Sequence, residues 1–443
     1  MNLPSQFSTT KNLLFGAVLF YCLCGTTSVY AVGDCLDNSA QGFPCYNVDL
    51  LSHVSLSDMQ AYKGNGNDLW GWTDPQTGKE YVLFGHSLGV SFIDVSDPEN
   101  PLYIGQLPSR IPNPNPRKGS DNDWRDIGVY ADHAYIVSEV EGHGLQVFDL
   151  SRLRGLDAGN RVFSSTFEYS GFGHAHNIVI NSDSGYAYVV GSFDCGAGGL
   201  LAFDLINPQL PIFVGCFFGD TYTHDAQCVN YMGPDQDHQG TEICFNANPD
   251  YYLADVDINT FAIVDVTNKS QPVEVNSITY PGARYAHQGW LTEDHSFFLL
   301  NDESDEWYYK KNTATLIFDV RDLDNPKFIG EHIGATRATG HNLYIHNGLV
   351  YEANYTAGLS VLSIDNIENG SLTEIGFFDV YPENNQRKYI GAWSVYPFFT
   401  SGTIAVSSVD RGLFVLRLGP DRSSVPASAR QTPAQKNRGG SSK

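Results

Sequence analysis

Positive charge is scarce in this 443-residue chain. Lys and Arg together number 26 against 50 Asp and Glu, so the formal net charge is −24 at pH 7. An acidic surface repels the phosphates of nucleic acids and of anionic membranes, which argues against both as partners. The same surface favours solubility and cation binding.

Long hydrophobic segments are also lacking. The apolar run Leu13–Cys24 is shorter than a membrane-spanning helix requires. Lys11 precedes it, and Val29-Tyr-Ala31 offers small residues for a cleavage site, so residues 1–31 are predicted to be a signal peptide. The tail, residues 420–443, is rich in Pro, Ser, Ala and Arg, and we expect it to be disordered and without a membrane anchor. The mature chain is therefore expected in the periplasm or the extracellular space.

Cysteine is limited to eight residues, two of which lie in the predicted signal peptide. An even number in an exported chain favours disulfides, although a thiolate metal site is an alternative. Pairing each cysteine with its neighbour along the sequence suggests the disulfides Cys35–Cys45, Cys195–Cys216 and Cys228–Cys244. The first pair would lie in an N-terminal disulfide-bearing segment, residues 32–46.

One motif recurs along the rest of the chain: a short apolar strand that ends in Asp or a substitute. Its copies are Val90–Asp94, Leu145–Asp149, Leu200–Asp204, Phe261–Asp265, Thr315–Asp319, Leu359–Ser363 and Leu413–Arg417. The terminal residues are 44 to 61 positions apart (363 − 319 = 44; 265 − 204 = 61). Short β-branched and aromatic strands at such a period are typical of propeller blades.

The sequence therefore predicts an all-β fold, a seven-bladed β-propeller over residues 47–419. The last blade has only three strands of its own, and we expect the strand Asn47–Ser55 to supply its fourth and close the ring. An open solenoid is the weaker alternative, because no segment resembles a polar capping repeat. The recurring Asp is interpreted as a turn cap rather than a metal ligand.

A second repeated feature lies at the start of the innermost strands. Four consecutive blades have a histidine at the same position; these are His176, His224, His287 and His341. Innermost strands line the central channel, so the four imidazoles should converge at its mouth, near carboxylates. Imidazole and carboxylate together suit a divalent transition metal such as Zn, Cu, Mn or Fe.

We interpret the four histidines as metal ligands. Asp126, Asp225 and Glu139 would orient them or act as acid–base groups, and Arg125 would hold an anionic group of a substrate. There are two alternatives: the histidines bind a substrate or act as acid–base groups without a metal, or they only make structural hydrogen bonds.

A calcium loop is a further candidate. Asp235-Gln-Asp-His-Gln-Gly-Thr-Glu242 places the oxygens of Asp235, Asp237 and Glu242 around a Gly. A plain acidic hairpin is the alternative interpretation of the same segment.

Several segments resemble a known family. Phe261-Ala-Ile-Val-Asp265 and its copies resemble LVIVD repeats, and longer stretches resemble the choice-of-anchor B family. The segments that carry the likeness include Asn67-Asp-Leu-Trp-Gly-Trp-Thr73, Thr223-His-Asp-Ala-Gln-Cys228, His287-Gln-Gly-Trp-Leu-Thr-Glu-Asp294 and Gly376-Phe-Phe-Asp-Val-Tyr-Pro382. The resemblance covers about residues 34–418. It implies an exported bacterial propeller, held at the cell surface by C-terminal anchors that differ between members, and it brings no catalytic assignment.

The chain departs from that family at its end. Arg438-Gly-Gly-Ser-Ser-Lys443 looks like the start of a Gly-rich sorting tail that lacks the hydrophobic helix and basic end. Release into the periplasm or medium is therefore favoured over surface anchoring.

The leading hypothesis is an exported, monomeric propeller with a metal-binding and hydrolytic or redox site at its channel mouth, acting on a small molecule or an extracellular polymer. The alternative is a non-catalytic binding module for a polymer or protein, with structural histidines.

Overall fold

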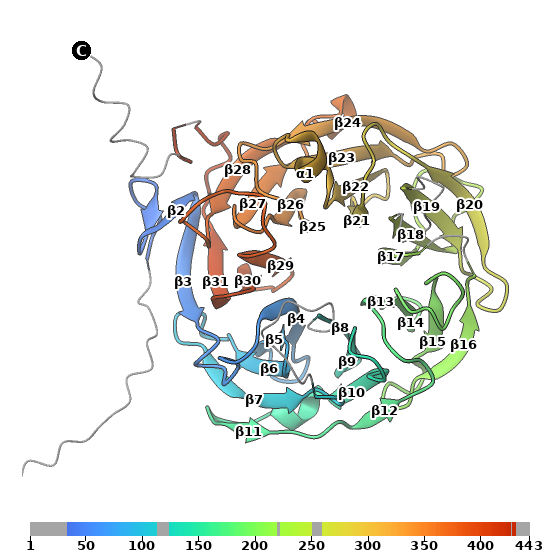
Figure 1. The fold of residues 1–443 in the computed structure, drawn as a ribbon, viewed down its shortest axis with the longest axis horizontal. Helices are drawn as coiled ribbons and strands as arrows, with labels where there is room; N and C mark the ends of the chain where they lie inside the picture. Colours follow the sequence, from blue (N-terminus) through green and yellow to red (C-terminus); the bar gives the residue numbers. More distant parts are fainter. Residues whose placement is uncertain (1–32, 113–123, 219–221, 250–258, 427, 431–443) are drawn as a thin grey trace, which may run out of the picture.

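Seven β-sheets form a closed ring in the computed structural model of the protein (Figure 1). The structure describes residues 33–112, 124–218, 222–249, 259–426 and 428–430. The innermost strands of neighbouring sheets contact one another in cyclic order around the ring. The prediction of an all-β, seven-bladed propeller is confirmed. Within the described ranges, the single α-helix is the five-residue α1 (Asp305–Tyr309).

The first four blades follow chain order, and their strands are given from the innermost outward. Blade 1 consists of β4 (Gly66–Thr73), β5 (Glu80–His86), β6 (Gly89–Asp94) and β7 (Leu102–Pro108). Blade 2 consists of β8 (Arg125–Tyr130), β9 (His133–Ser138), β10 (Leu145–Asp149) and β12 (Phe167–Tyr169). Blade 3 consists of β13 (Asn177–Asn181), β14 (Tyr186–Val190), β15 (Leu201–Asp204) and β16 (Ile212–Cys216). Blade 4 consists of β17 (Asp225–Asn230), β18 (Glu242–Asn248), β19 (Thr260–Asp265) and β20 (Val273–Ile278).

The remaining blades complete the ring. Blade 5 consists of β21 (Ala286–Leu291), β22 (Phe297–Asp302), β23 (Ala314–Asp319) and β24 (Lys327–Ile333). Blade 6 consists of β25 (Asn342–His346), β26 (Leu349–Ala353), β27 (Leu359–Ser363) and β28 (Thr373–Phe378). Blade 7 consists of β29 (Ala392–Tyr396), β30 (Thr403–Ser408), β31 (Gly412–Leu418) and β3 (Val48–Val54).

Strands from other parts of the chain extend three of the blades. In blade 7 the outermost strand, β3, pairs antiparallel with β31. The hairpin of β1 (Ser39–Ala40) and β2 (Phe43–Tyr46) continues blade 6 beyond β28. The short β11 (Arg161–Val162) pairs in parallel with β7 of blade 1. The N-terminal segment thus contacts both of the last two blades.

The repeated motif forms the third strand of every blade, and its terminal Asp caps the turn that follows. The Asp carboxylate accepts a hydrogen bond from the backbone N–H two residues further on, at 2.7–3.1 Å. This bond is made by Asp94, Asp149, Asp204, Asp265 and Asp319. The turn-cap interpretation is confirmed, because these oxygens are used to shape the hairpin.

The core lies between the blades. Phe245, Phe261 and Phe298 stack with centroid separations of 4.4–5.9 Å and join blade 4 to blade 5. Burying each such side chain contributes about 1.5–3 kcal/mol. Because a single four-stranded sheet has two apolar faces, stacking on both neighbours is what makes each blade stable.

All three expected disulfides are present: Cys35–Cys45, Cys195–Cys216 and Cys228–Cys244. In the last pair, the two cysteines lie directly opposite each other on β17 and β18. Such bonds fit an exported protein. Within the described ranges, no helix has the length and apolar character needed to cross a bilayer. The predicted signal peptide lies outside the described residues, as do residues 427 and 431–443 of the predicted disordered tail. Residues 420–426 and 428–430 are described, and this part of the tail contacts blade 6: the Val425 N–H donates to the Glu374 carbonyl, and Arg430 pairs with the Glu374 carboxylate.

Candidate metal centre at the channel mouth

The four predicted histidines form one continuous layer. Each lies at the start of an innermost strand, and neighbouring imidazole centroids are 3.9 Å (His176–His224), 4.3 Å (His224–His287) and 4.4 Å (His287–His341) apart. Two indoles continue this layer: Trp393 lies 4.5 Å from His341 and 4.4 Å from Trp124. The common register therefore becomes an arc of six neighbouring rings, tilted or edge-on to one another, across six blades.

Backbone carbonyls of neighbouring blades hold the imidazoles in place. His224 Nδ1 donates to the carbonyl oxygen of His287 at 3.0 Å, and His341 Nδ1 donates to that of Trp393. Since Nδ1 carries the proton in each bond, Nε2 keeps its lone pair. Gly191 permits the close approach of His176, because a Cβ on this glycine would lie 2.5 Å from the His176 Cβ.

Two carboxylates face this layer. Glu139 Oε1 accepts from His176 Nδ1 at 2.5 Å. The Glu303 oxygens lie 3.8 Å from both His287 Nε2 and His341 Nε2, and Tyr355 donates to Glu303 Oε1 at 2.7 Å.

These groups line a cavity of about 440 Å³. We call it the His cavity, defined by Glu139, His176, His224, His287, Glu303 and His341. Tyrosines at its rim were not predicted from the sequence. The sequence contains a signal that could have identified two of them, the repeated Tyr-x-His spacing in Tyr222-Thr-His224 and Tyr285-Ala-His287.

Burial controls the protonation of the His cavity. It lowers the pKa of His341 to about 3, and it lowers the pKa of His224 and His287 well below the ordinary value. Burial also raises the pKa of Glu303 to about 7. For His176, burial acts to lower the pKa, but the adjacent Glu139 raises it overall. The three other histidines are thus neutral at pH 7, the form that binds metal ions.

One group in the cavity has the composition of a metal site. Ligand atoms of His287, Glu303 and His341 all lie within 4.8 Å of one another. Two imidazole nitrogens and one carboxylate oxygen suit Zn, Mn, Fe or Cu. Because ligand bonds of about 2.0–2.2 Å bring ligand atoms closer together than this, binding would require a small inward shift. His176 and His224 lie further along the arc.

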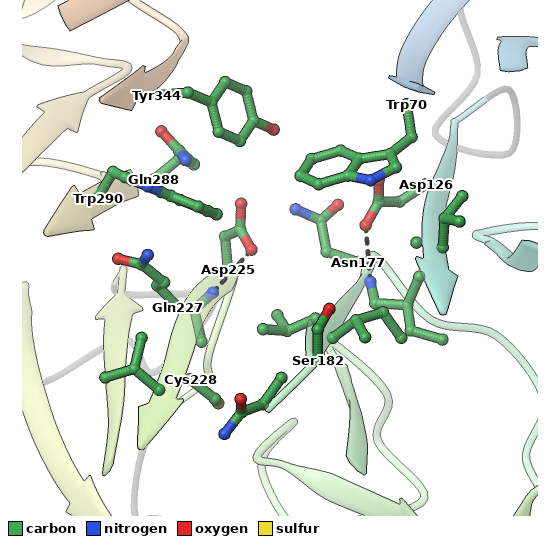
Figure 2. A pocket seen from close by; sticks show the side chains of 18 of the residues that line it. Trp70, Asp126, Asn177, Ser182, Asp225, Gln227, Cys228, Gln288, Trp290 and Tyr344 are labelled. Carbon is green, nitrogen blue, oxygen red and sulfur yellow. Dashed lines mark hydrogen bonds between the residues drawn. The ribbon is translucent and has the colours of Figure 1, made fainter. Parts of the chain in front are cut away.

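Two predicted acid–base residues do not reach the His cavity. Asp126 and Asp225 line a separate cavity of about 560 Å³, shown in Figure 2. In β17, Asp225 directly follows His224, and successive side chains of a strand point in opposite directions. Of the four predicted acid–base and anion-binding residues, only Glu139 lies among the histidines in the His cavity.

Arg125 joins blade 1 to blade 2. Its side chain is 2% exposed, and its guanidinium donates to the carbonyl oxygens of His86 (2.8 Å) and Ser87 (3.1 Å). These bonds hold the loop after β5. The guanidinium thus has a structural role, which differs from the predicted contact with an anionic substrate.

The predicted calcium ligands do not converge on one point. Glu242 is buried, where Lys269 Nζ lies 2.7 Å from Oε2 and Tyr188 donates to Oε1 at 2.7 Å. Asp235 instead belongs to a group with His238 and Asp324. In that group His238 Nε2 lies 3.1 Å from Asp324, and Asp235 accepts from the Leu323 N–H. The loop connects β17 to β18 within blade 4 and contacts blade 5 through Leu323 and Asp324. It is an acidic hairpin rather than a calcium loop, because Glu242 already pairs with Lys269.

Comparisons with known proteins support the fold alone. No family model matches the chain. No curated protein matches it. Similar solved structures include U3-55K, at 9% identity and a TM-score of 0.50, over 81% of this chain and 97% of that chain. A complex of KlAtg21 with the coiled coil of AgAtg16 matches at 12% identity and a TM-score of 0.48, over 82% and 98% of the two chains. A functionally unknown protein from Desulfotomaculum acetoxidans DSM 771 matches at 13% identity and 0.46, over 70% and 88%.

Proposed function

We propose that this chain is an exported propeller of the choice-of-anchor B type that binds a divalent transition metal in its His cavity. His287, His341 and Glu303 would hold the ion. The ion would supply Lewis-acid or redox chemistry toward a small molecule or an extracellular polymer. Glu139 and His176, as a hydrogen-bonded pair, would hold or move a proton at the edge of the site.

A single observation carries the proposal: two imidazole Nε2 atoms each lie 3.8 Å from one oxygen of the same half-buried carboxylate, that of Glu303. Contacts around the group support a ligand role. The Nδ1–H of His341 bonds to a backbone carbonyl, and Tyr355 orients the carboxylate. Such outer contacts are typical of metal-ligating residues, because they set the tautomer and the ring orientation.

The second candidate function is a binding module without a metal. The arc of neighbouring imidazole and indole rings favours it, since those rings also join the blades by packing and by backbone hydrogen bonds. In that case the rim aromatic residues would contact a polymer or protein ligand. The two functions differ in whether the protein holds a metal ion.

The deciding experiment is elemental mass spectrometry on protein exported to the periplasm. We expect about one transition-metal ion per chain. His287→Ala and Glu303→Gln should each lower the occupancy at least tenfold, because each removes one of three ligands. His346→Ala is the matched control, since His346 is 31% exposed and lies at the far end of β25.

Circular dichroism should confirm that the variants remain folded. Metal-free protein that stays metal-free after incubation with Zn²⁺, Mn²⁺, Fe²⁺ and Cu²⁺ would contradict the proposal and favour the binding module. Equal loss of metal in His346→Ala would mean that the ion binds elsewhere.

A further inference from the structure

The cavity of Figure 2 extends along the innermost strands, away from the His cavity. Its lining begins at the first residues of β13 and β17, Asn177 and Asp225, which directly follow two of the histidines, and it continues to the far ends of these strands. We call it the Trp/Asp cavity, defined by Asp68, Trp70, Asp126, Asp225, Trp290 and Tyr344. Its volume of about 560 Å³ is in the usual range for small-molecule sites, roughly 300–1,000 Å³.

Its inner end carries the carboxyl groups of Asp68, Asp126 and Asp225. Asp68 is 4% exposed and Asp126 is 9% exposed. Among the described residues that line the cavity, none is Lys or Arg. Each carboxyl group accepts the backbone N–H of the residue that follows it. Asp126 also accepts from the Ile178 N–H at 2.7 Å, and Asp68 also accepts from Asn342 Nδ2 at 3.3 Å. Burial raises the pKa of Asp126 to about 6 and that of Asp225 to about 8, so a cation bound beside them would favour the ionised form of Asp225. The net charge of the whole chain also attracts cations.

Aromatic faces form the wall next to the carboxylates. Trp70 and Trp290 lie on either side of Tyr344, at centroid distances of 5.7 Å and 5.0 Å and at steep angles. Figure 2 shows the three rings around the opening above the carboxylate of Asp225. A cation over the face of Trp or Tyr is attracted by the ring quadrupole. Carboxylates and aromatic faces therefore favour the same kind of ligand.

The amides of the cavity argue against a sugar. Gln288 uses both ends of its carboxamide, donating to the Leu343 carbonyl at 2.9 Å and accepting from the Leu343 N–H at 2.8 Å. Gln227 accepts from the Leu291 N–H at 2.7 Å. These bonds join neighbouring blades, so both ends of the Gln288 carboxamide and the oxygen of Gln227 are already engaged. A bare metal ion would fill only a small part of the volume.

We propose that the Trp/Asp cavity binds an organic ammonium ion with an apolar body. The ammonium group would lie near Asp225 and Asp126, and the body would lie along Trp290 and Trp70. This site is separate from the proposed metal centre and does not require it.

The test uses three probes with the same aryl body and different head groups: 2-phenylethylamine, 2-phenylethanol and 3-phenylpropionate. Isothermal titration calorimetry and tryptophan fluorescence on the full protein at pH 7.5 should detect binding of the amine. The alcohol should bind at least tenfold more weakly, and the carboxylate should not bind. The metal content should remain constant throughout.

Two variants test the assigned contacts. Asp225→Asn removes the carboxyl group that can ionise beside a cation, while its remaining oxygen can still accept from the Ala226 N–H. Trp290→Leu removes a ring face. Each should weaken amine binding at least tenfold while the thermal unfolding midpoint shows that the protein is folded. His287→Ala should bind the amine normally, which separates this proposal from the metal centre.

Three results would overturn the proposal. They are equal affinity for amine and alcohol, amine binding that neither variant changes, and binding of maltose without binding of the amine. The last result would identify the aromatic wall as a sugar platform.

Discussion

At the scale of single residues, Glu242 shows why a sequence motif can mislead. Asp235, Asp237 and Glu242 have the spacing of calcium ligands, but Glu242 accepts from Tyr188, Ser184 and Asn181 and pairs with Lys269. All four partners are distant from Glu242 in the sequence, and only the fold brings them next to it. A buried carboxylate that already has its partners is a structural group rather than a calcium ligand.

Substitution of Glu242 should therefore destabilise the fold. Glu242→Ala leaves Lys269 without its buried partner, and we expect a loss of about 3–5 kcal/mol in the free energy of unfolding. Denaturation in urea measures this loss. Asp237→Ala in the same hairpin is the control and should change stability by less than about 0.5 kcal/mol. A rise in the unfolding midpoint on addition of Ca²⁺ that Glu242→Ala abolishes would restore the calcium interpretation.

At the scale of elements, β3 completes the outer edge of blade 7. Val48 and Leu50 on this strand are fully buried in the cluster that joins blade 6 to blade 7. Without β3, the backbone groups of β31 would form an open sheet edge, which promotes association with other chains.

Deletion of residues 33–56 should consequently produce aggregated or unfolded protein. Size-exclusion chromatography and circular dichroism measure the outcome. The control is the double variant Cys35→Ser/Cys45→Ser, which retains β3 and loses only the disulfide. It should stay folded, with a loss of about 2–4 kcal/mol. A deletion variant that remains monomeric with the native unfolding midpoint would contradict the closing role of β3.

At the scale of the whole molecule, buried ionisable groups determine how stability depends on pH. Burial raises the pKa of Asp379 to about 7 and that of Glu306 to about 10. Unfolded carboxyls have a pKa of about 4, so the folded state retains protons that the unfolded state releases. The resulting stabilisation is complete below pH 4 and is lost as pH rises through each folded value.

Buried histidines act in the opposite direction. Burial lowers the pKa of His86 and of His143 to about 3. An unfolded histidine has a pKa of about 6.5, so the stabilisation from these neutral imidazoles is present above pH 6.5 and is lost as pH falls. Above pH 6.5 the contribution of the histidines to the free energy of unfolding is constant. The buried carboxyl groups then determine how this free energy changes with pH.

The free energy of unfolding should accordingly decrease from pH 6.5 to pH 9. Urea denaturation at intervals of half a pH unit measures the slope. Glu306→Gln should flatten it across this range, by up to about 1.4 kcal/mol per pH unit. Asp379→Asn should flatten it only below about pH 7. A stability that rises from pH 7 to pH 9 would contradict both assignments.

Much of the fold followed from local pattern. The third-strand motif predicted the number of blades, and its Asp predicted the turn caps, because both depend on residues within a few positions of one another. The register of His176, His224, His287 and His341 predicted that these side chains meet. Equivalent positions of repeated units come together when the repeats form a ring.

What only the tertiary structure decided is which side chains from different blades share a cavity. His224 and Asp225 are adjacent in sequence, yet they face different cavities, because successive side chains of an extended chain point in opposite directions. Glu303 joins His287 and His341 only because the ring places blade 5 beside blade 6. The sequence by itself determined the repeating unit and its turns, since these depend on contacts between near neighbours. The packing of blades determined the partners, since those contacts are between residues far apart in the chain.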